Sequence, residues 1–138
     1  MTLWSVDTSA WHHSMAASVA ERWRNALDAD SLAICDQVRL EILFSARSAI
    51  DYGNLAEELG GLHVIPSDAA TFQRALEVQR RLAQVGGLHH RSVKIADLLI
   101  AAASESVGAV VWHYDADFDR ISAVTGQPTE WIAPRGSL

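Results

Sequence analysis

Residues 92–118 read SVKIADLLIAAASESVGAVVWHYDADF, and this stretch decides the fold class. Ser92–Val107 has the length and apolar content of a helix, whereas Gly108–His113 is an apolar run of strand length. A helix that leads directly into a short apolar strand is typical of a parallel sheet whose strands are joined by crossover helices. The stretch therefore predicts an α/β fold.

The same alternation of short and long segments extends over the rest of the chain. We expect further strands at Leu3–Asp7, Leu32–Cys35, Leu62–Ile65 and Glu130–Ile132. We expect further helices at Ser14–Ala29, Gln37–Ser48 (with Asp36 as its cap), Tyr52–Leu59 and Phe118–Thr125, and one capped by Ser67 or Asp68 that ends near Val85. A length of 138 residues suits one domain. The pattern predicts a single domain over residues 1–138 with a central, mostly parallel sheet of about five strands.

The composition excludes several classes of protein. Hydrophobic residues make up 49% of the chain and charged residues 20%, which is typical of a globular protein. The longest apolar stretch, Ile95–Ala103, contains Asp97 and has about half the length that a membrane-spanning helix needs. No secretory signal is visible, so we expect a cytoplasmic protein. The net charge of -6 argues against a general nucleic-acid coat, because phosphate binding depends on Lys and Arg.

Cys35 is the only cysteine, which excludes an internal disulfide and a thiolate zinc cluster. We expect Cys35 to be a small buried strand residue. The pairs His12-His13 and His89-His90 do not predict zinc either, because adjacent imidazoles on a helix point about 100° apart.

Five carboxylates lie within or beside apolar segments, where an unpaired charge is costly: Asp7, Glu41, Asp97, Asp115 and Asp117. The chain has a single lysine and scattered arginines, so a divalent cation is the more economical counter-charge. Oxygen ligands without thiolates favour Mg²⁺, with Mn²⁺ as a substitute. Two such ions can support phosphodiester cleavage. Taken singly, Asp7 could be a helix cap, and Asp115 with Asp117 could form a solvated turn.

The basic residues nearest to these acids in the sequence are Arg80, Arg81, Arg91 and Lys94. They could contact RNA phosphates or belong to an ordinary solvated helix face and loop. Trp11 follows the Asp7 loop and could stack on a base or pack against a partner.

Four acidic motifs resemble those of PIN-domain ribonucleases, in the same order along the chain, and are most similar to the VapC toxins of bacterial toxin–antitoxin pairs. They are Val6-Asp7-Thr8-Ser9-Ala10, Arg39-Leu40-Glu41-Ile42-Leu43, Ala96-Asp97-Leu98-Leu99-Ile100-Ala101-Ala102 and His113-Tyr114-Asp115-Ala116-Asp117-Phe118, and the resemblance extends into the tail Glu130–Leu138. It implies a three-layer α/β/α PIN domain with strand order 3-2-1-4-5.

The resemblance also implies roles for individual residues. Asp7, Glu41, Asp97 and Asp115 would form a catalytic acidic quartet, and the metal ligands would be Asp7, Asp97, Asp115 and Asp117. Ser9 matches a small polar position that supports the first acid. His113 replaces the Thr or Ser common at its position, and it could orient Asp115, contact RNA or merely end the strand. Arg91 and Lys94 are candidates for support or RNA contact.

By the same resemblance, the expected function is that of a Mg²⁺- or Mn²⁺-dependent endoribonuclease toxin. Its substrate would be tRNA, rRNA or mRNA, it would form a homodimer, and a VapB-like antitoxin would neutralise it. We expect the antitoxin groove between the helices Ser14–Ala29 and Gln37–Leu59, where one sheet face would not readily bury all the apolar side chains: Met15, Val19, Trp23, Leu43 and Phe44.

Two alternatives belong to other classes. A phosphatase with Asp7 as nucleophile would need a second acid shortly after it, but Thr8-Ser9-Ala10-Trp11 follow. A Mg²⁺-binding receiver-type signalling domain would need a phosphoacceptor Asp after the third strand and a Lys after the fifth. Here Pro66 intervenes before Asp68, and the only lysine lies in a predicted helix.

Overall fold

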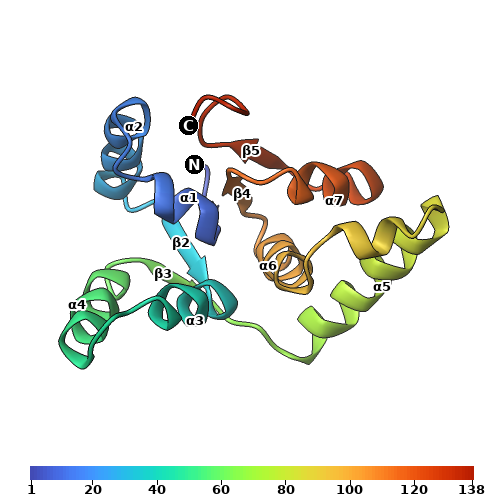
Figure 1. The fold of residues 1–138 in the computed structure, drawn as a ribbon, viewed down its shortest axis with the longest axis horizontal. Coiled ribbons are helices and arrows are strands. Elements are labelled where there is room, and N and C mark those ends of the chain that lie inside the picture. Colours follow the sequence, from blue (N-terminus) through green and yellow to red (C-terminus); the bar gives the residue numbers. More distant parts are fainter.

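The computed structural model describes residues 1–138, in which five strands form one parallel sheet in the order β3-β2-β1-β4-β5 (Figure 1). The strands are β1 (Trp4–Val6), β2 (Leu32–Cys35), β3 (His63–Ile65), β4 (Val110–His113) and β5 (Thr129–Trp131). Central β1 pairs with β2 through Trp4 and Leu32, and with β4 through Val6 and Trp112. The α/β class and the strand order are confirmed. Receiver-type domains have the order 2-1-3-4-5, so the strand order disfavours that alternative.

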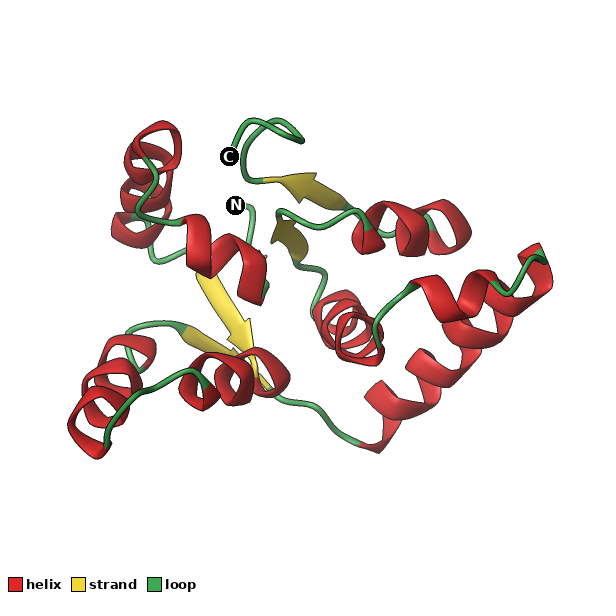
Figure 2. Cartoon of the chain, viewed as in Figure 1, coloured by secondary structure: helices red, strands yellow, loops and turns green.

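Helices cover both faces of the sheet and complete three layers (Figure 2). They are α1 (Thr8–His13), α2 (Ala17–Asp28), α3 (Asp36–Phe44), α4 (Ala49–Leu59), α5 (Ala69–Val85), the short 3₁₀ helix η1 (His89–Ser92), α6 (Ile95–Ser106) and α7 (Asp117–Thr125). Helices α5 and α6 pack against each other, and α6 also contacts β4 and β2. None of these helices has the length and apolar character needed to cross a membrane.

The helix predicted over Ser14–Ala29 is wrong at its start. The carboxylate of Asp7 accepts a hydrogen bond from the Ala10 main-chain N–H and starts α1 directly after β1. The chain is extended at Ala16, where α2 begins anew. Met15 therefore lies between the two helices and is 86% exposed.

Two other predicted helices differ at their ends, and capping explains one difference. The predicted helix Gln37–Ser48 ends at Phe44, because the Ser48 hydroxyl accepts from the Asp51 N–H and starts α4. Asp36 lies in the first turn of α3 instead of capping it, and it accepts from the Ser67 N–H. The predicted helix Ser92–Val107 is α6 and begins only at Ile95, because Ser92 is the last residue of η1.

The core joins the inner faces of the sheet to those of the helices. All four residues of β2 are buried, as expected for a parallel strand covered on both faces. Cys35 is fully buried, which confirms its predicted place, and burial raises the pKa of its thiol to about 11. Val19, expected in an exposed apolar groove, is also fully buried, whereas Phe44 is 91% exposed. Trp23 and Leu43 are partly buried.

Candidate metal centre

The carboxyl ends of β1 and β4 meet at one edge of the sheet and carry the first acidic residues. Val6 and Trp112 lie in register, so Asp7 after β1 and Asp115 after β4 occupy neighbouring loops. In open parallel sheets, ligands bind at this edge. The first turns of α6 and α7 supply Asp97 and Asp117.

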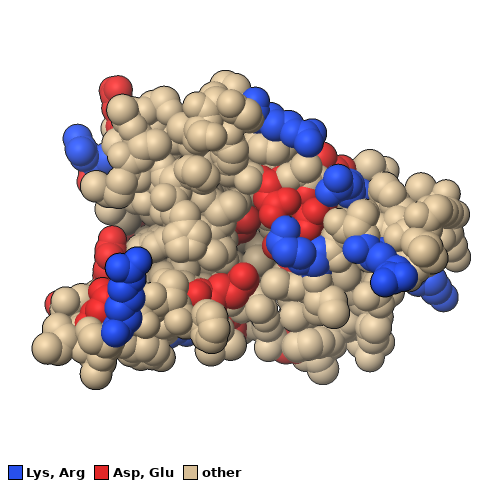
Figure 3. Space-filling view, viewed as in Figure 1, with Lys and Arg blue, Asp and Glu red and all other residues tan.

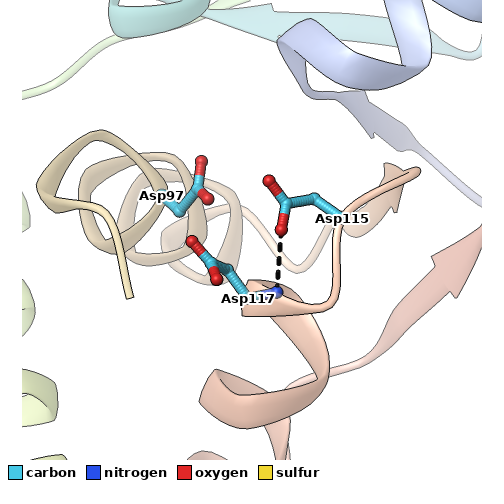
Figure 4. A group of neighbouring side chains, drawn as sticks. All are labelled: Asp97, Asp115 and Asp117. Atoms are coloured by element: carbon cyan, nitrogen blue, oxygen red, sulfur yellow. Dashed lines mark hydrogen bonds between the residues drawn. The ribbon is translucent and has the colours of Figure 1, made fainter. Parts of the chain in front are cut away.

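Three of these carboxylates form a cluster, and their side chains point toward a common space (Figure 4). One oxygen each from Asp97, Asp115 and Asp117 can be chosen so that all lie within 4.8 Å of one another. The Asp117 N–H donates to Asp115 Oδ1 at 2.9 Å, which fixes the turn that holds both acids. Asp97 is only 5% exposed, and its buried Oδ2 has no hydrogen-bond partner. This is the kind of oxygen cluster that can hold a hard cation.

Two basic side chains contact the cluster, which corrects the sequence argument that basic partners are scarce here. Lys94 Nζ lies 2.7 Å from Asp115 Oδ2, 3.0 Å from Asp117 Oδ2 and 3.4 Å from Asp97 Oδ2. Arg120 Nη1 lies 2.9 Å from Asp117 Oδ1. Figure 3 shows the acidic side chains gathered at the centre of this face, with Lys or Arg side chains against them.

Arg120 was not among the residues predicted for this site, and Lys94 was predicted there without a definite partner. Each stands three residues from an acid of the cluster, Lys94 before Asp97 and Arg120 after Asp117. The three-residue spacing was the one feature of the sequence that could have indicated these ion pairs, because side chains three residues apart on a helix are neighbours.

The buried acids have perturbed pKa values. Burial raises the pKa of Asp97 to about 8, and its contact with Asp117 adds to the rise. Burial alone would raise the pKa of Asp117 as well, but hydrogen bonds from Asp97 and from the main chain and side chain of Lys94 lower it below the usual value. Burial of the Lys94 amine would lower its pKa, but the bonds to Asp115 and Asp117 outweigh this and raise it. Without metal, the proton that Asp97 tends to keep and the cations of Lys94 and Arg120 therefore offset the negative charge of the cluster.

Asp7 lies outside the three-carboxylate cluster and is a helix cap. The Ser9 hydroxyl is 2.8 Å from both Asp7 oxygens, and Ala10 N donates to Asp7 Oδ1 at 2.8 Å. Ser9 Oγ also accepts from the Tyr114 N–H at 2.9 Å, so it joins the loops after β1 and β4. Burial raises the pKa of Asp7 to about 6 despite these bonds, and the negative charge of Asp115 adds to the rise. Only Oδ1 accepts the capping bond, whereas Oδ2 has the Ser9 hydroxyl as its one hydrogen-bond neighbour.

Glu41 also lies outside the cluster. It belongs to α3, which contacts α1 and α6, and it is partly buried. Its Oε1 is buried and has no hydrogen-bond partner. A buried carboxylate oxygen without a donor is unusual in a folded protein.

His113 positions the loop that carries Asp115. It is fully buried between Phe118 and Trp131, with ring centroids 5.0 Å away on each side. Its Nδ1 accepts from the Asp115 N–H at 3.2 Å. Burial lowers the pKa of His113 to about 4, so the ring is neutral and Nδ1 is free to accept. Of the three expected roles, orientation of Asp115 and the end of the strand both fit this position, and the buried ring is not exposed for contact with RNA.

The side chains of two further candidates form no hydrogen bond with the acids, although the Trp11 main-chain N–H donates to the Asp7 carbonyl. Arg91 is exposed in η1 and makes no side-chain hydrogen bond or ion pair. Trp11 packs edge-on against Trp23 with 5.9 Å between ring centroids, so it is held within the protein.

Comparisons with known proteins agree with this geometry. Residues 5–124 match the model of the PIN domain family. Ribonuclease VapC18 of Mycobacterium tuberculosis (strain ATCC 25618 / H37Rv) is 66% identical over 133 residues, covering 96% of this chain and 97% of the relative. Ribonuclease VapC51 of the same strain is 41% identical over 133 residues, covering 96% of this chain and 95% of the relative.

The fold also resembles solved toxin–antitoxin complexes. The DNA-bound VapBC structure from Salmonella typhimurium aligns with a TM-score of 0.78 at 19% identity, covering 96% of this chain and 100% of that chain. VapBC-5 from Mycobacterium tuberculosis aligns with a TM-score of 0.60 at 24% identity, covering 95% and 98%. At these identities the likeness concerns the fold alone.

Proposed function

The chain belongs to the PIN domain family, and we propose that it is a VapC-type endoribonuclease that depends on Mg²⁺ or Mn²⁺ and acts as the toxin of a toxin–antitoxin pair. The observation that carries the proposal is the cluster of Asp97, Asp115 and Asp117 at the carboxyl edge of the sheet. The names of the curated relatives support a ribonuclease. We propose that residues 1–138 form one PIN domain that meets its RNA in the cytoplasm.

The acidic residues fit a divalent cation. The buried oxygens Asp97 Oδ2, which lies 3.4 Å from Lys94 Nζ, and Glu41 Oε1 accept no hydrogen bond and are acceptors that a hard cation would satisfy. Asp97, Asp115 and Asp117 would hold the ion, with Asp7 as a further ligand and Glu41 completing the catalytic quartet. A bound ion would supply an activated water and would offset the charge that develops on the phosphodiester.

The surrounding residues hold these acids in place. Ser9 ties the Asp7 loop to the Tyr114 main chain, and His113 holds the Asp115 N–H. Arg120 offsets part of the negative charge on Asp117. Arg91 is exposed and free of partners, so it is available to RNA phosphates. The substrate would be tRNA, rRNA or mRNA.

We propose a VapB-like antitoxin as the partner of the exposed apolar side chains on α3 and α4. Leu40 and Phe44 of α3 are 67% and 91% exposed, and Ile50 of α4 is 78% exposed. Leu40 and Phe44 flank Glu41 along α3, so a partner at this surface would lie beside the acidic residues. Exposed apolar side chains grouped in this way are typical of interaction sites. The protein itself would form a homodimer.

Sequencing of RNA 5′ ends after induced expression tests the ribonuclease proposal. Wild type should produce new 5′ ends at defined positions, whereas Asp97→Asn should not. Asp28→Asn removes the same charge from an exposed position on α2 and should behave as wild type. New 5′ ends in the Asp97→Asn culture, or none in the wild type, would overturn the proposal.

A further inference from the structure

The amine of Lys94 lies where a cation bound by the three carboxylates would lie. Its Nζ is 2.7 Å, 3.0 Å and 3.4 Å from oxygens of Asp115, Asp117 and Asp97. The ammonium group donates hydrogen bonds to Asp115 and Asp117, and its contact with Asp97 is an ion pair without a hydrogen bond. Mg²⁺ binds oxygen at about 2.0–2.1 Å and would need these same oxygens. The amine and a divalent cation cannot share this space, because their charges repel and their ligands are the same.

From this geometry we propose that Lys94 is a built-in counter-ion that occupies the three-carboxylate site in the metal-free protein and competes with the divalent cation. The inference rests on the proposed metal site. It makes Lys94 a residue that sets how much free metal the protein requires, in addition to any contact with RNA.

The amine can leave the site without disturbing the acids. The Lys94 side chain is 62% exposed and has four flexible carbons, so Nζ can move into solvent. The main-chain N–H of Lys94 separately donates to Asp117 Oδ2 at 3.0 Å. Because that bond does not involve the side chain, substitution of Lys94 leaves the support of Asp117 in place.

Removal of the amine should therefore favour metal. Without Lys94, three carboxylates would face only Arg120, and the metal-free site would carry more uncompensated negative charge. A bound cation would relieve that repulsion and would no longer have to displace a competitor. The metal-free protein should lose stability while its metal affinity rises.

Isothermal titration with Mn²⁺, without RNA and at constant ionic strength, tests the competition. Lys94→Met should bind Mn²⁺ about tenfold more tightly than wild type, which corresponds to ~1.4 kcal/mol. Lys94→Arg keeps the charge and should bind within about twofold of wild type, or ~0.4 kcal/mol. Arg91→Met removes an exposed positive charge three residues away and should also match wild type. Lys94→Gln replaces Lys94→Met if the latter does not fold.

The wild-type protein offers a second test, because Lys94 is the only lysine in the chain. In protein labelled with ¹³C,¹⁵N-lysine, the Cε and Nζ signals should move to the values of a free, solvated lysine during a Mg²⁺ titration. The midpoint should equal that of Mg²⁺ binding measured by calorimetry. Unchanged lysine signals at saturating Mg²⁺ would overturn the proposal.

The calorimetric outcomes separate the two proposals. Equal or weaker Mn²⁺ affinity in Lys94→Met would refute the competition while leaving the metal site intact. Absence of Mn²⁺ binding in both proteins would instead refute the metal site, and with it the competition. Neither of these calorimetric outcomes depends on whether the protein cleaves RNA.

Discussion

Asp97 lies in the first turn of an apolar helix, where its charge is costly unless something neutralises it. It is almost fully buried, and Lys94 approaches Asp97 Oδ2 no closer than 3.4 Å. Burial and two acidic neighbours raise the pKa of Asp97 to about 8, so its metal-free form tends to hold a proton. A site that stays partly protonated without metal gives up that proton when a cation binds.

Asp97→Asn should therefore abolish metal-dependent RNA cleavage while preserving the fold. The amide is neutral, like the protonated acid, and avoids the repulsion that an ionised Asp97 would meet, so the free energy of unfolding in EDTA should hold or rise. Cleavage assays with Mg²⁺ or Mn²⁺ and thermal melts in EDTA measure the two effects. Full cleavage by Asp97→Asn would remove this residue from the site.

The raised pKa values of Asp97 and Asp7 predict how metal-free stability depends on pH. Both groups hold protons more tightly in the folded chain (pKa about 8 and about 6) than at the ordinary value of 3.8. The folded state therefore binds more protons between pH ~4 and pH ~8, and the free energy of unfolding falls as pH rises through that window. Each unit of pKa difference corresponds to at most ~1.4 kcal/mol.

Urea unfolding in EDTA at several pH values between 4 and 9 measures this slope. Asp97→Asn should reduce the slope, because the histidines and other acids are common to both proteins. Saturating Mn²⁺ should also reduce the slope of the free energy of unfolding against pH in the wild type. Identical slopes for wild type and Asp97→Asn would show that Asp97 titrates normally.

At the residue scale, the sequence could identify the acids but not their counter-ions. Asp97 stands out because the residues around it are apolar, and Asp115 and Asp117 directly follow a buried strand. Lys94 and Arg120 carry no such signal, since a basic residue three positions from an acid is equally typical of a solvated helix surface. Which partner an acid meets depends on how α6 and α7 come together, and this is a tertiary property.

At the scale of elements, strands were predictable where burial is complete. Strand β2 coincides with the predicted Leu32–Cys35, because a parallel strand covered on both faces is apolar throughout. The cap of α5 was predictable to within one residue, Ser67 or Asp68, and Asp68 is the cap because it accepts from the Thr71 N–H. The start of α1 at Thr8 and the break before Ser48 were not predictable, because caps on Asp7 and Ser48 decide them and both residues also suit other structures. The break at Ser14–Ala16 has no side-chain cap that the sequence could show.

The Ser9 hydroxyl connects the segments that follow β1 and β4 through hydrogen bonds to Asp7 and Tyr114, so Ser9→Ala should destabilise the protein. The change leaves the Tyr114 N–H without its acceptor and takes a donor from the buried Asp7 carboxylate. We expect a loss of about 1–2 kcal/mol in the free energy of unfolding. Urea denaturation measures it, with Ser18→Ala, an exposed serine of α2, as the control. Equal stability of Ser9→Ala and Ser18→Ala would mean that solvent replaces these bonds at no cost.

At the scale of the whole molecule, the metal should link distant elements, because its proposed ligands follow β1 and β4 and begin α6 and α7. Mg²⁺ or Mn²⁺ should raise the melting temperature of the wild type by mass action. The rise should be much smaller for the double variant Glu41→Gln with Asp115→Asn. Thermal melts across a cation titration provide the comparison, and equal rises in both proteins would place the cation elsewhere.

Partner binding is the other property of the whole molecule, and the exposed apolar side chains of α3 and α4 predict where an antitoxin docks. Phe44→Asp with Ile50→Asp should weaken antitoxin binding at least about tenfold, because a charge replaces apolar contact area. The same variant should still cleave RNA, since neither side chain belongs to the acidic cluster. Val85→Asp, at an exposed apolar position on α5, should change neither property if the surface is specific.

Co-expression with the small open reading frame expected beside this gene, followed by light scattering and cleavage assays, measures stoichiometry and inhibition together. The toxin alone should scatter as a homodimer, and the wild-type complex should be inactive. A monomer that stays fully active in excess antitoxin would contradict both the assembly and the inhibition.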